Sequence, residues 1–423
     1  MVRKQALPKE VWIGWVASMT EAYNMAIYAF TAPFLAKLMF RQETAWSAVF
    51  FSYCLVFIGS CLFYPAGATY YGFVGDKRGR NKTCIYSTFG LAIATGMMGL
   101  IPIHFLGDNA WVWFIFLICS QYFFSGGEYS GSIVFSLEHS KGQQNGLMSA
   151  MSCLFAVFGL IAANGLATLS LLTQDERWIR VCFLIGAGGG VISYLLKNQC
   201  RETPAFIAIP QESLRSIGIV SLIKTRWPEI LGSVLILGLF NVACSFIFVF
   251  LPLVYNNQEF DTFKSLIAYG LFLIISGYLA DRIGMTKVIS IGAGLLTVSI
   301  IPLCYFCRNL LTLQLILTVF ACLVIGPIHG WMLHQFEVQE RCRGIFISSA
   351  IAMSVFGGST VPICLIIFEK FHSTAICCIY PFVIFALSFI YLISRRAREF
   401  DIRGQKYSLS GTKEGPRFQN QQR

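Results

Sequence analysis

Charged residues are scarce in this chain. Asp, Glu, Lys and Arg together make up 13% of its 423 residues, whereas hydrophobic residues make up 56%. Soluble domains usually carry about 25% charged residues, and a chain of this length with so little charge cannot cover a water-exposed surface. The scarcity of charge therefore excludes a soluble protein and indicates that a lipid bilayer surrounds the chain.

Patterns that support catalysis or metal binding are also absent from the sequence. Cys304 and Cys307 lie three residues apart, but no second pair accompanies them, as a structural zinc site would require. The glycines at 188–190 lack the Lys-Ser/Thr that follows in a phosphate-binding loop. No ordered set of Ser, His and Asp indicates a nucleophilic site. We therefore expect no enzyme activity, no cofactor and no bound metal.

Long apolar runs are abundant instead. A membrane-spanning helix needs about 20 mostly apolar residues, and the chain offers twelve such runs: 11–36, 46–70, 83–105, 111–136, 145–172, 179–197, 229–254, 262–280, 288–307, 311–336, 345–369 and 373–394. We predict an all-α membrane protein of twelve transmembrane helices. Its N-terminal six-helix half occupies 1–197, a cytoplasmic linker 198–228, the C-terminal six-helix half 229–394, and a basic, disordered cytoplasmic tail 395–423.

The positive charges follow the sidedness that membrane proteins show. With the N-terminus placed inside, the inner segments hold 25 of the 32 Lys and Arg residues, and the outer segments hold seven. The positive-inside rule then places both termini in the cytoplasm. Membrane topology thus accounts for the net charge of +11, and no nucleic-acid partner is expected. We expect a multi-pass monomer in the plasma membrane, which is the inner membrane in a bacterium.

A basic loop punctuated by glycine joins the second and third runs and recurs 205 residues later. The coinciding positions are Gly72/Gly277, Asp76/Asp281, Lys77/Arg282, Gly79/Gly284 and Lys82/Lys287. Half the chain is about 211 residues, so a duplicated chain would place the copy here. The second copy has Met285 and Thr286 where basic residues are expected, which predicts that the first loop dominates.

These loops are candidates for a cytoplasmic charge clamp. Asp76 could cap a neighbouring helix or pair with a cation, and the glycines permit close helix contact and a tight turn. Glu138 and the Arg341/Arg343 pair occupy equivalent loops of the two halves, after the fourth and tenth runs. The predicted gate residues are Gly72, Asp76, Lys77, Arg78, Gly79, Arg80, Glu138, Asp281, Arg282, Gly284, Arg341 and Arg343. A solvated run of charge is the alternative interpretation.

The spacing Gly-x-x-x-Asp-Arg/Lys-x-Gly-Arg at 72–80 resembles the cytoplasmic signature of the major facilitator superfamily, with Lys77 in place of the usual Arg. Three further segments resemble the metabolite:proton symporters, and within them the proline/betaine transporters: 21–30 (EAYNMAIYAF), 126–132 (GGEYSGS) and 201–206 (RETPAF). The resemblance implies a twelve-helix facilitator fold and a midplane site reached by alternating access. It also implies proton-driven uptake of a small zwitterion or organic acid.

Two positions depart from that family. The aspartate of its first helix corresponds to Asn24, and the arginine of its second helix corresponds to Tyr64. Losing both members of an intramembrane pair costs less than losing one, which would leave a buried unpaired charge. The departures favour an altered substrate or altered coupling, so an uncoupled facilitator or an exchanger is the alternative. A non-transporting membrane sensor with the same fold is the alternative of another class.

Two carboxyl groups within the predicted membrane helices are candidates for proton coupling. Glu21 lies ten residues into the first run, about 15 Å along a helix axis and hence near the midplane. Glu128 follows Gly126 and Gly127 in the fourth run. Burial disfavours the charged form of a carboxyl, so a buried carboxyl takes up a proton more readily, as a proton carrier must. Glu21 could instead pair with a cation, and each carboxyl could simply hydrogen-bond to a neighbouring helix.

Other polar and aromatic residues of the runs are candidates for the substrate cavity. Asn24 and Tyr28 share a helix face with Glu21, and that face is expected to line the cavity. The cavity candidates are Asn24, Tyr28, Tyr64, Gln121, Tyr129, Asn241 and Trp331. An aromatic cavity would suit a quaternary ammonium ligand through cation–π contact. The expected partners are therefore a small molecule, protons and the lipid bilayer.

Overall fold

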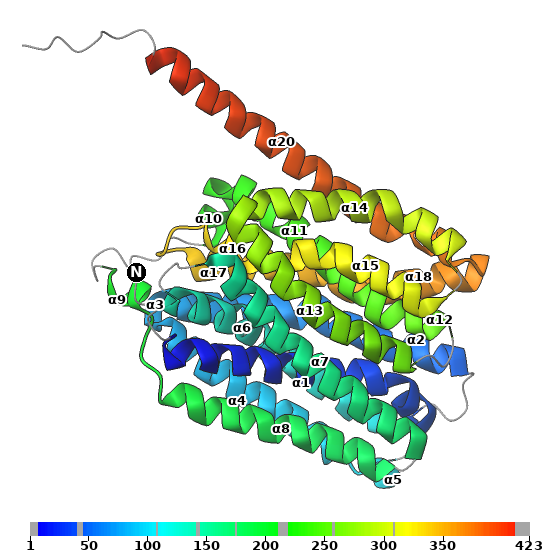
Figure 1. The fold of residues 1–423 in the computed structure, drawn as a ribbon. Helices are drawn as coiled ribbons and strands as arrows, with labels where there is room; N and C mark the ends of the chain where they lie inside the picture. The colour runs from blue at the N-terminus through cyan, green and yellow to red at the C-terminus, as the bar shows by residue number, and fades with distance from the viewer. Residues whose placement is uncertain are drawn as a thin grey trace, which may run out of the picture.

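The computed structural model describes residues 7–39, 45–106, 109–140, 144–173, 176–209, 219–255, 259–307 and 309–410. Within these ranges the chain is almost entirely helical and has no β-strand. The helices run side by side in one bundle (Figure 1). This confirms the predicted all-α fold, because a helix satisfies its own backbone polar groups in an apolar surrounding.

The helices follow the predicted apolar runs. The first half comprises α1 (Lys9–Met39), α2 (Ala45–Ile58), α3 (Tyr64–Arg78), α4 (Arg80–Gly99), α5 (Ile103–Leu106), α6 (Ala110–His139), α7 (Asn145–Thr173) and α8 (Glu176–Asn198). The connection holds α9 (Pro204–Ile207) and α10 (Ile219–Thr225). The second half comprises α11 (Trp227–Ser245), α12 (Leu251–Val254), α13 (Glu259–Ile283), α14 (Met285–Phe306), α15 (Leu310–Ile325), α16 (Ile328–Leu333), α17 (Arg341–Ala352), α18 (Gly358–Phe371), α19 (Thr374–Cys377) and α20 (Ile379–Ser410).

Ten segments of the described residues are long and apolar enough to cross a membrane. The predicted runs 11–36 and 83–105 fall on α1 and α4, which are not among the ten. Both helices carry polar groups that the fold buries, such as Glu21 and Asn24 in α1 and Ser87 and Thr88 in α4. Their polarity reflects what they contact inside the bundle, and the whole is consistent with a fold of twelve spanning helices.

Several spans are interrupted near the middle of the bundle. A π-helical turn at Gly59–Phe63 joins α2 to α3, one at Phe246–Phe250 joins α11 to α12, and one at Met353–Gly357 joins α17 to α18. The tenth span breaks between α15 and α16 at Gly326 and Pro327. Such interruptions redirect side chains and free backbone groups.

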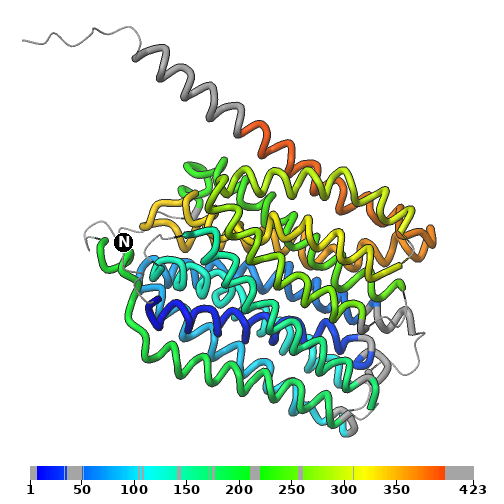
Figure 2. The backbone as a smooth tube through the Cα atoms, in the orientation of Figure 1, coloured from blue at the N-terminus to red at the C-terminus, as the bar shows by residue number. Residues whose placement is uncertain are grey.

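The bundle consists of two parts, each a group of helices, that lie side by side along their length. Figures 1 and 2 show the helices before α9 gathered in one part and those after α10 in the other. Across the boundary α7 packs against α13, and α3 packs against α17. We call the end of the bundle where α9 and the N-terminus lie, at the left of Figure 1, the α9 end.

The C-terminal helix departs from the prediction. The sequence predicts a disordered tail from Arg395, but α20 continues to Ser410. Residues 395–410 are therefore helical, as one continuation of a helix that the bundle already anchors. The remaining residues of the predicted tail, 411–423, lie outside the described residues.

Candidate functional site

A cavity of about 270 Å³ lies between the two parts of the bundle. α1, α3, α6 and α7 line one side of it, and α11, α13, α16 and α17 line the other. Residues of the π-helical turns 246–250 and 353–357 also reach it, among them Phe248 and Met353. The helix interruptions thus occur where a ligand would be held.

Glu21 is the main polar feature of this cavity. Its side chain is 7% exposed, and its Oε1 accepts a hydrogen bond of 2.7 Å from the Ser125 hydroxyl of α6. Its second oxygen bonds to no described residue. No other carboxyl group, and no Lys or Arg, lines the cavity among the residues the structure describes. The cavity therefore contains one isolated acidic group.

Three other predicted cavity residues line the same space: Tyr64, Tyr129 and Asn241. The Tyr129 hydroxyl lies 3.2 Å from Nε2 of His329, so α6 and α16 meet across the boundary between the two parts. The Asn241 amide donates to the Leu237 carbonyl at 2.9 Å within α11. Tyr64 directly follows the π-helical turn before α3, and such turns often occur at functional sites.

Asn24 and Gln121 do not line the cavity. Asn24 faces α8, where a Cβ on Gly186 would lie 2.3 Å from Asn24 Oδ1. Gln121 donates through Nε2 to the Asn24 carbonyl at 2.8 Å and to Thr95 Oγ1 at 2.9 Å. Residues three apart point about 60° away from each other on a helix. Because α1 is surrounded by other helices, that rotation carries Asn24 from the cavity to the contact with α8.

Tyr28 and Trp331 also lie elsewhere. The Tyr28 hydroxyl donates to the Ser52 carbonyl at 3.4 Å, which ties α1 to α2. Trp331 is 4% exposed, and the guanidinium of Arg395 lies 5.6 Å from the centre of its ring. Both residues are therefore involved in helix packing in this structure.

Glu128 is part of a buried cluster outside the cavity. It pairs with Lys197 of α8, and both side chains are almost completely enclosed. The hydroxyls of Ser87, Thr88 and Ser132 donate to its oxygens at 2.6–2.9 Å. Lys197 Nζ also donates to Thr88 and Ser132. Every charge here has partners, as a buried pair requires, so the cluster binds α4, α6 and α8 together.

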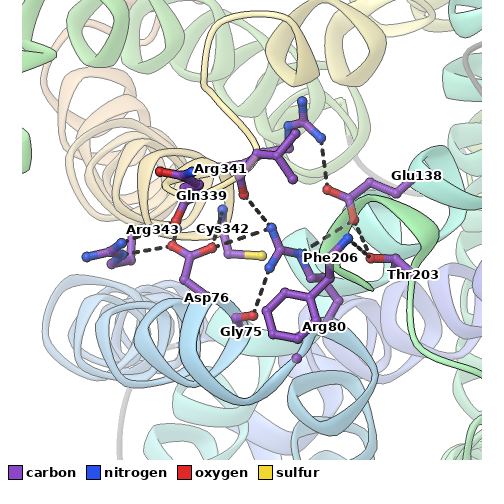
Figure 3. Close-up of polar contacts among 12 residues, drawn as sticks. Gly75, Asp76, Arg80, Glu138, Thr203, Phe206, Gln339, Arg341, Cys342 and Arg343 are labelled. Carbon is purple, nitrogen blue, oxygen red and sulfur yellow. Dashed lines mark hydrogen bonds and ion pairs between the residues drawn. The ribbon is translucent and has the colours of Figure 1, made fainter. Parts of the chain in front are cut away.

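Asp76 lies at the α9 end, where α3 meets α17 (Figure 3). Its carboxylate accepts from the backbone N–H groups of Cys342 and Arg343 at 3.2 and 3.1 Å, and from Arg343 Nε at 2.8 Å. Those N–H groups belong to the first turn of α17, which has no helical partners for them. Asp76 therefore caps a helix of the other part while also pairing with a cation.

Arg80 and Glu138 extend this contact (Figure 3). The guanidinium of Arg80 donates to the carbonyls of Gly75 and Val338, and its Nε lies 3.5 Å from Glu138. Glu138 also accepts from Arg341 Nη1 at 2.9 Å. We call Asp76, Arg80, Glu138, Arg341 and Arg343 the latch. It joins α3, α4 and α6 to α17 and to the loop before it.

The segment after α8 contacts Arg80 and Glu138 of the latch. The Phe206 ring lies 4.8 Å from the Arg80 guanidinium, and the Thr203 hydroxyl donates to Glu138 at 2.6 Å. Glu202 accepts from the backbone N–H groups of Arg80 and Asn81, the first residues of α4. Gly79, whose φ of 111° favours glycine, brings the chain into this position.

The second copy of the loop repeats the cap but not the ion pair. Asp281 accepts from the backbone N–H groups of Gly146 and Leu147 at 2.7 and 2.9 Å, in the first turn of α7. Gly284 has a φ of 99°, close to that of Gly79. No described cation pairs with Asp281. The two aspartates thus make matching contacts across the boundary in opposite directions.

The remaining predicted gate residues take different places. Gly72 lies against α17, where a Cβ would be 3.3 Å from Arg343 Cα. Lys77 and Arg78 are exposed at the end of α3, and Lys77 lies over the Phe73 ring. Arg282 lies over the Tyr278 ring. These three cations therefore contribute no hydrogen bond to the latch among the contacts of the described residues.

A further ion pair holds the loop between α16 and α17. Arg226 pairs with Glu337 and, through Nε at 2.5 Å, with Glu340. Burial raises the pKa of Glu340, and the Arg226 charge opposes that rise. The loop directly before the latch arginines of α17 is thus fixed to Arg226, the residue before α11.

Several residues of these sites were not anticipated from the sequence. Lys197 is the last residue of the predicted run 179–197, and no pattern in the sequence assigned it a role. Ser125 and His329 had no charge pattern to distinguish them. The one available signal for the Glu128–Lys197 pair was that one apolar run ends in a single Lys and another contains a single Glu.

Known proteins of similar sequence and structure fit this arrangement. Residues 14–276 match the family described as the Major Facilitator Superfamily. The ectoine/proline transporter of Corynebacterium glutamicum is 25% identical over 397 residues, covering 84% of this chain and 77% of that protein. The proline/betaine transporter of Salmonella typhimurium is 24% identical over 321 residues, covering 70% and 64%.

Solved structures agree on the fold. The crystal structure of the human organic anion transporter MFSD10 superimposes with a TM-score of 0.69 at 14% identity, covering 91% of this chain and 99% of that one. The family match extends over more than half the chain. It includes the loop of Asp76 and the helices α1, α3, α6 and α7, which line one side of the cavity. The chain is a multi-pass membrane protein that belongs to the Major Facilitator Superfamily.

Proposed function

We propose that the protein is a proton-coupled secondary transporter that carries a small polar metabolite across the membrane by alternating access. The observation that supports this most is the cavity between the two parts, with the isolated Glu21 on its wall. A site between two halves that rock against each other is the arrangement on which alternating access depends. Glu21 would carry the proton, because a carboxyl in an apolar site readily takes one up.

The latch is the proposed gate on the cytoplasmic side. It must open for the α9 end of the cavity to reach water, since its contacts join the two halves. The excess of Lys and Arg in the loops of that end supports a cytoplasmic location for it and for both termini. We further propose that residues 1–197 and 229–394 are the moving halves, and that the protein works as a monomer in the plasma membrane, the inner membrane if its host is a bacterium.

Counterflow in proteoliposomes tests this function without any assumption about coupling. Protein-loaded vesicles would be filled with one unlabelled solute and exposed to the same labelled solute outside. Proline, betaine and ectoine, which the names of the relatives mention, would be tested beside organic acids, sugars and amino acids. Accumulation of at least one solute is expected. Failure of every solute with folded protein would favour a non-transporting sensor.

Replacing Glu21 tests the coupling. Glu21→Gln keeps the hydrogen-bonding shape but carries no proton, so the dependence of transport on pH should disappear. Glu369→Gln, on the exposed end of α18, is the matched control and should behave as the unaltered protein. Unchanged pH dependence in Glu21→Gln would exclude it as the coupling group.

Exchange without net proton-driven uptake is the second candidate. Tyr64, which stands where relatives of this kind carry an arginine, lines the cavity, and Asn24 does not. Among the described residues, the cavity lining thus contains no ion pair that could bind a proton and a charged solute together. Counterflow that persists while net uptake is insensitive to a pH gradient would support the exchanger.

A further inference from the structure

The charge of the cavity wall has one sign. Glu21 is the single carboxyl among the described lining residues, and none of them is Lys or Arg. Ser125 holds one of its oxygens, at 2.7 Å. The other bonds to no described residue, although the side chain is only 7% exposed. A ligand in this cavity therefore meets one negative group and no permanent positive group.

His329 does not supply the missing positive charge. Its ring is 5% exposed, lies 3.2 Å from the Tyr129 hydroxyl, and packs at a right angle against Phe240. No carboxylate of the described residues bonds to it. An imidazolium ion there would be a buried charge without a counter-ion, which is costly. The neutral ring is therefore the favoured form, and it cannot neutralise a ligand carboxylate.

The rest of the wall suits a small cation. Aromatic rings from both parts line the cavity, including Tyr64, Tyr122, Phe240, Phe248 and Tyr269. The faces of such rings attract ammonium groups, more strongly where water is excluded. The volume of about 270 Å³ lies below the range of roughly 300–1,000 Å³ that drug-sized ligands occupy. A metabolite of a few heavy atoms fits.

We propose that the cavity binds a small organic monocation, an amine or a quaternary ammonium ion, at Glu21, and that this cation and a proton compete for the same carboxyl. The inference rests on the proposed transport function. The ionised carboxyl binds the cation, and the protonated carboxyl has no charge with which to hold it. Each cation bound therefore displaces one proton, so transport is an exchange of cation for proton, not a symport.

Other titratable groups do not change this competition. The groups that line the cavity with Glu21 are Tyr64 on α3, Tyr122 and Tyr129 on α6, Cys153 on α7, Cys244 on α11, Tyr269 on α13 and His329 on α16. All of these are neutral in an apolar site near pH 7. Behind the wall, Glu128 is paired with Lys197, so the pair adds no net charge.

A matched pair of ligands tests the charge argument. Choline and glycine betaine share a trimethylammonium group, but betaine adds a carboxylate that this cavity cannot neutralise. In counterflow with the full-length protein, choline should be transported at a rate roughly tenfold or more above that of betaine, and succinate should not be transported. An inside-acid pH gradient should accelerate choline uptake, because protons leave as choline enters. Under symport, an outside-acid gradient would accelerate it.

A binding measurement tests the competition separately from transport. Calorimetric titration of the purified protein with choline, in two buffers of different ionisation enthalpy and at a pH low enough to protonate the free carboxyl, should show release of about one proton per choline. Glu21→Gln should abolish that release and weaken choline binding, whereas Glu369→Gln should change neither. Choline binding with proton release but without counterflow would support the assigned site and contradict the transport function.

Three results would overturn the inference. Betaine or succinate transported at least as fast as choline would show that a positive group acts in the site, although transport itself would stand. Choline uptake driven by an outside-acid gradient would show that cation and proton bind together. Absence of both choline binding and counterflow in folded protein would refute the cation site.

Discussion

The latch makes one quantitative prediction, for the substitution Asp76→Asn. The Asp76 carboxylate is 5% exposed and accepts three hydrogen bonds from Cys342 and Arg343 of α17. Breaking a buried ion pair by removing one partner costs about 3–5 kcal/mol. The contacts exist only while the halves touch at the α9 end. The loss should therefore shift the equilibrium toward the open latch by roughly a hundredfold to a few thousandfold.

Cys342 reports this opening directly. Its thiol is 1% exposed, and a Cβ on Gly75 of α3 would lie 3.1 Å from its Sγ. A thiol reagent reaches it only when α3 and α17 separate. The rate of Cys342 modification, followed by mass spectrometry of its peptide, should rise in Asp76→Asn by the factor given above.

Asp281→Asn is the matched control. Asp281 caps α7 through two N–H groups and pairs with no described cation, so its loss should cost about 1 kcal/mol. The population of protein with an open latch should then increase by roughly fivefold. Equal effects of the two substitutions would refute the reasoning, as would an unchanged modification rate in Asp76→Asn while the unfolding temperature stays the same.

Four further substitutions test the buried Glu128–Lys197 pair and the two glycines of positive φ. Lys197→Met leaves Glu128 buried without its cation and should lower the free energy of unfolding by about 3–5 kcal/mol. Adding Glu128→Leu should restore most of the lost stability, as measured by thermal unfolding. No recovery in the double variant would contradict the pairing. Gly79→Ala should destabilise the α9 end, since its Cβ would lie 2.1 Å from Glu202 and φ is 111°. Gly284→Ala, at φ 99° in open space, should cost only the backbone strain of about 1–2 kcal/mol, so denaturant titration should find it the milder change.

The fold was largely predictable because a bilayer imposes strong constraints on a sequence. Apolar runs near 20 residues and the repeat of the Asp76 loop are enough to place the helices and the family. The pairing of Asp76 with α17 also follows the expectation that it caps a neighbouring helix. The continuation of α20 to Ser410 was not predictable, because polar residues continue a helix as readily as they form a tail.

The cavity was harder to predict, because a helix inside a bundle has no face that is plainly inner or outer. Glu21 and Asn24 are three residues apart, yet one meets the cavity and the other meets α8. Lys197 could not be assigned because its partner, Glu128, lies 69 residues earlier. Side chains that contact across such distances leave no local pattern in the sequence.

The two aspartate caps also bear on how this chain can diverge. Asp76 and Asp281 bind main-chain N–H groups, and every residue except proline offers the same N–H group. The residues at 147, 342 and 343 can therefore change in side chain without loss of the cap, whereas a Cβ on Gly146 would lie 2.8 Å from Asp281 Oδ1 and disturb it. The second loop has lost its basic residues at Met285 and Thr286 but keeps the Asp281 contact. Proline at any of those four positions is the substitution that a lineage of this protein should be unable to tolerate.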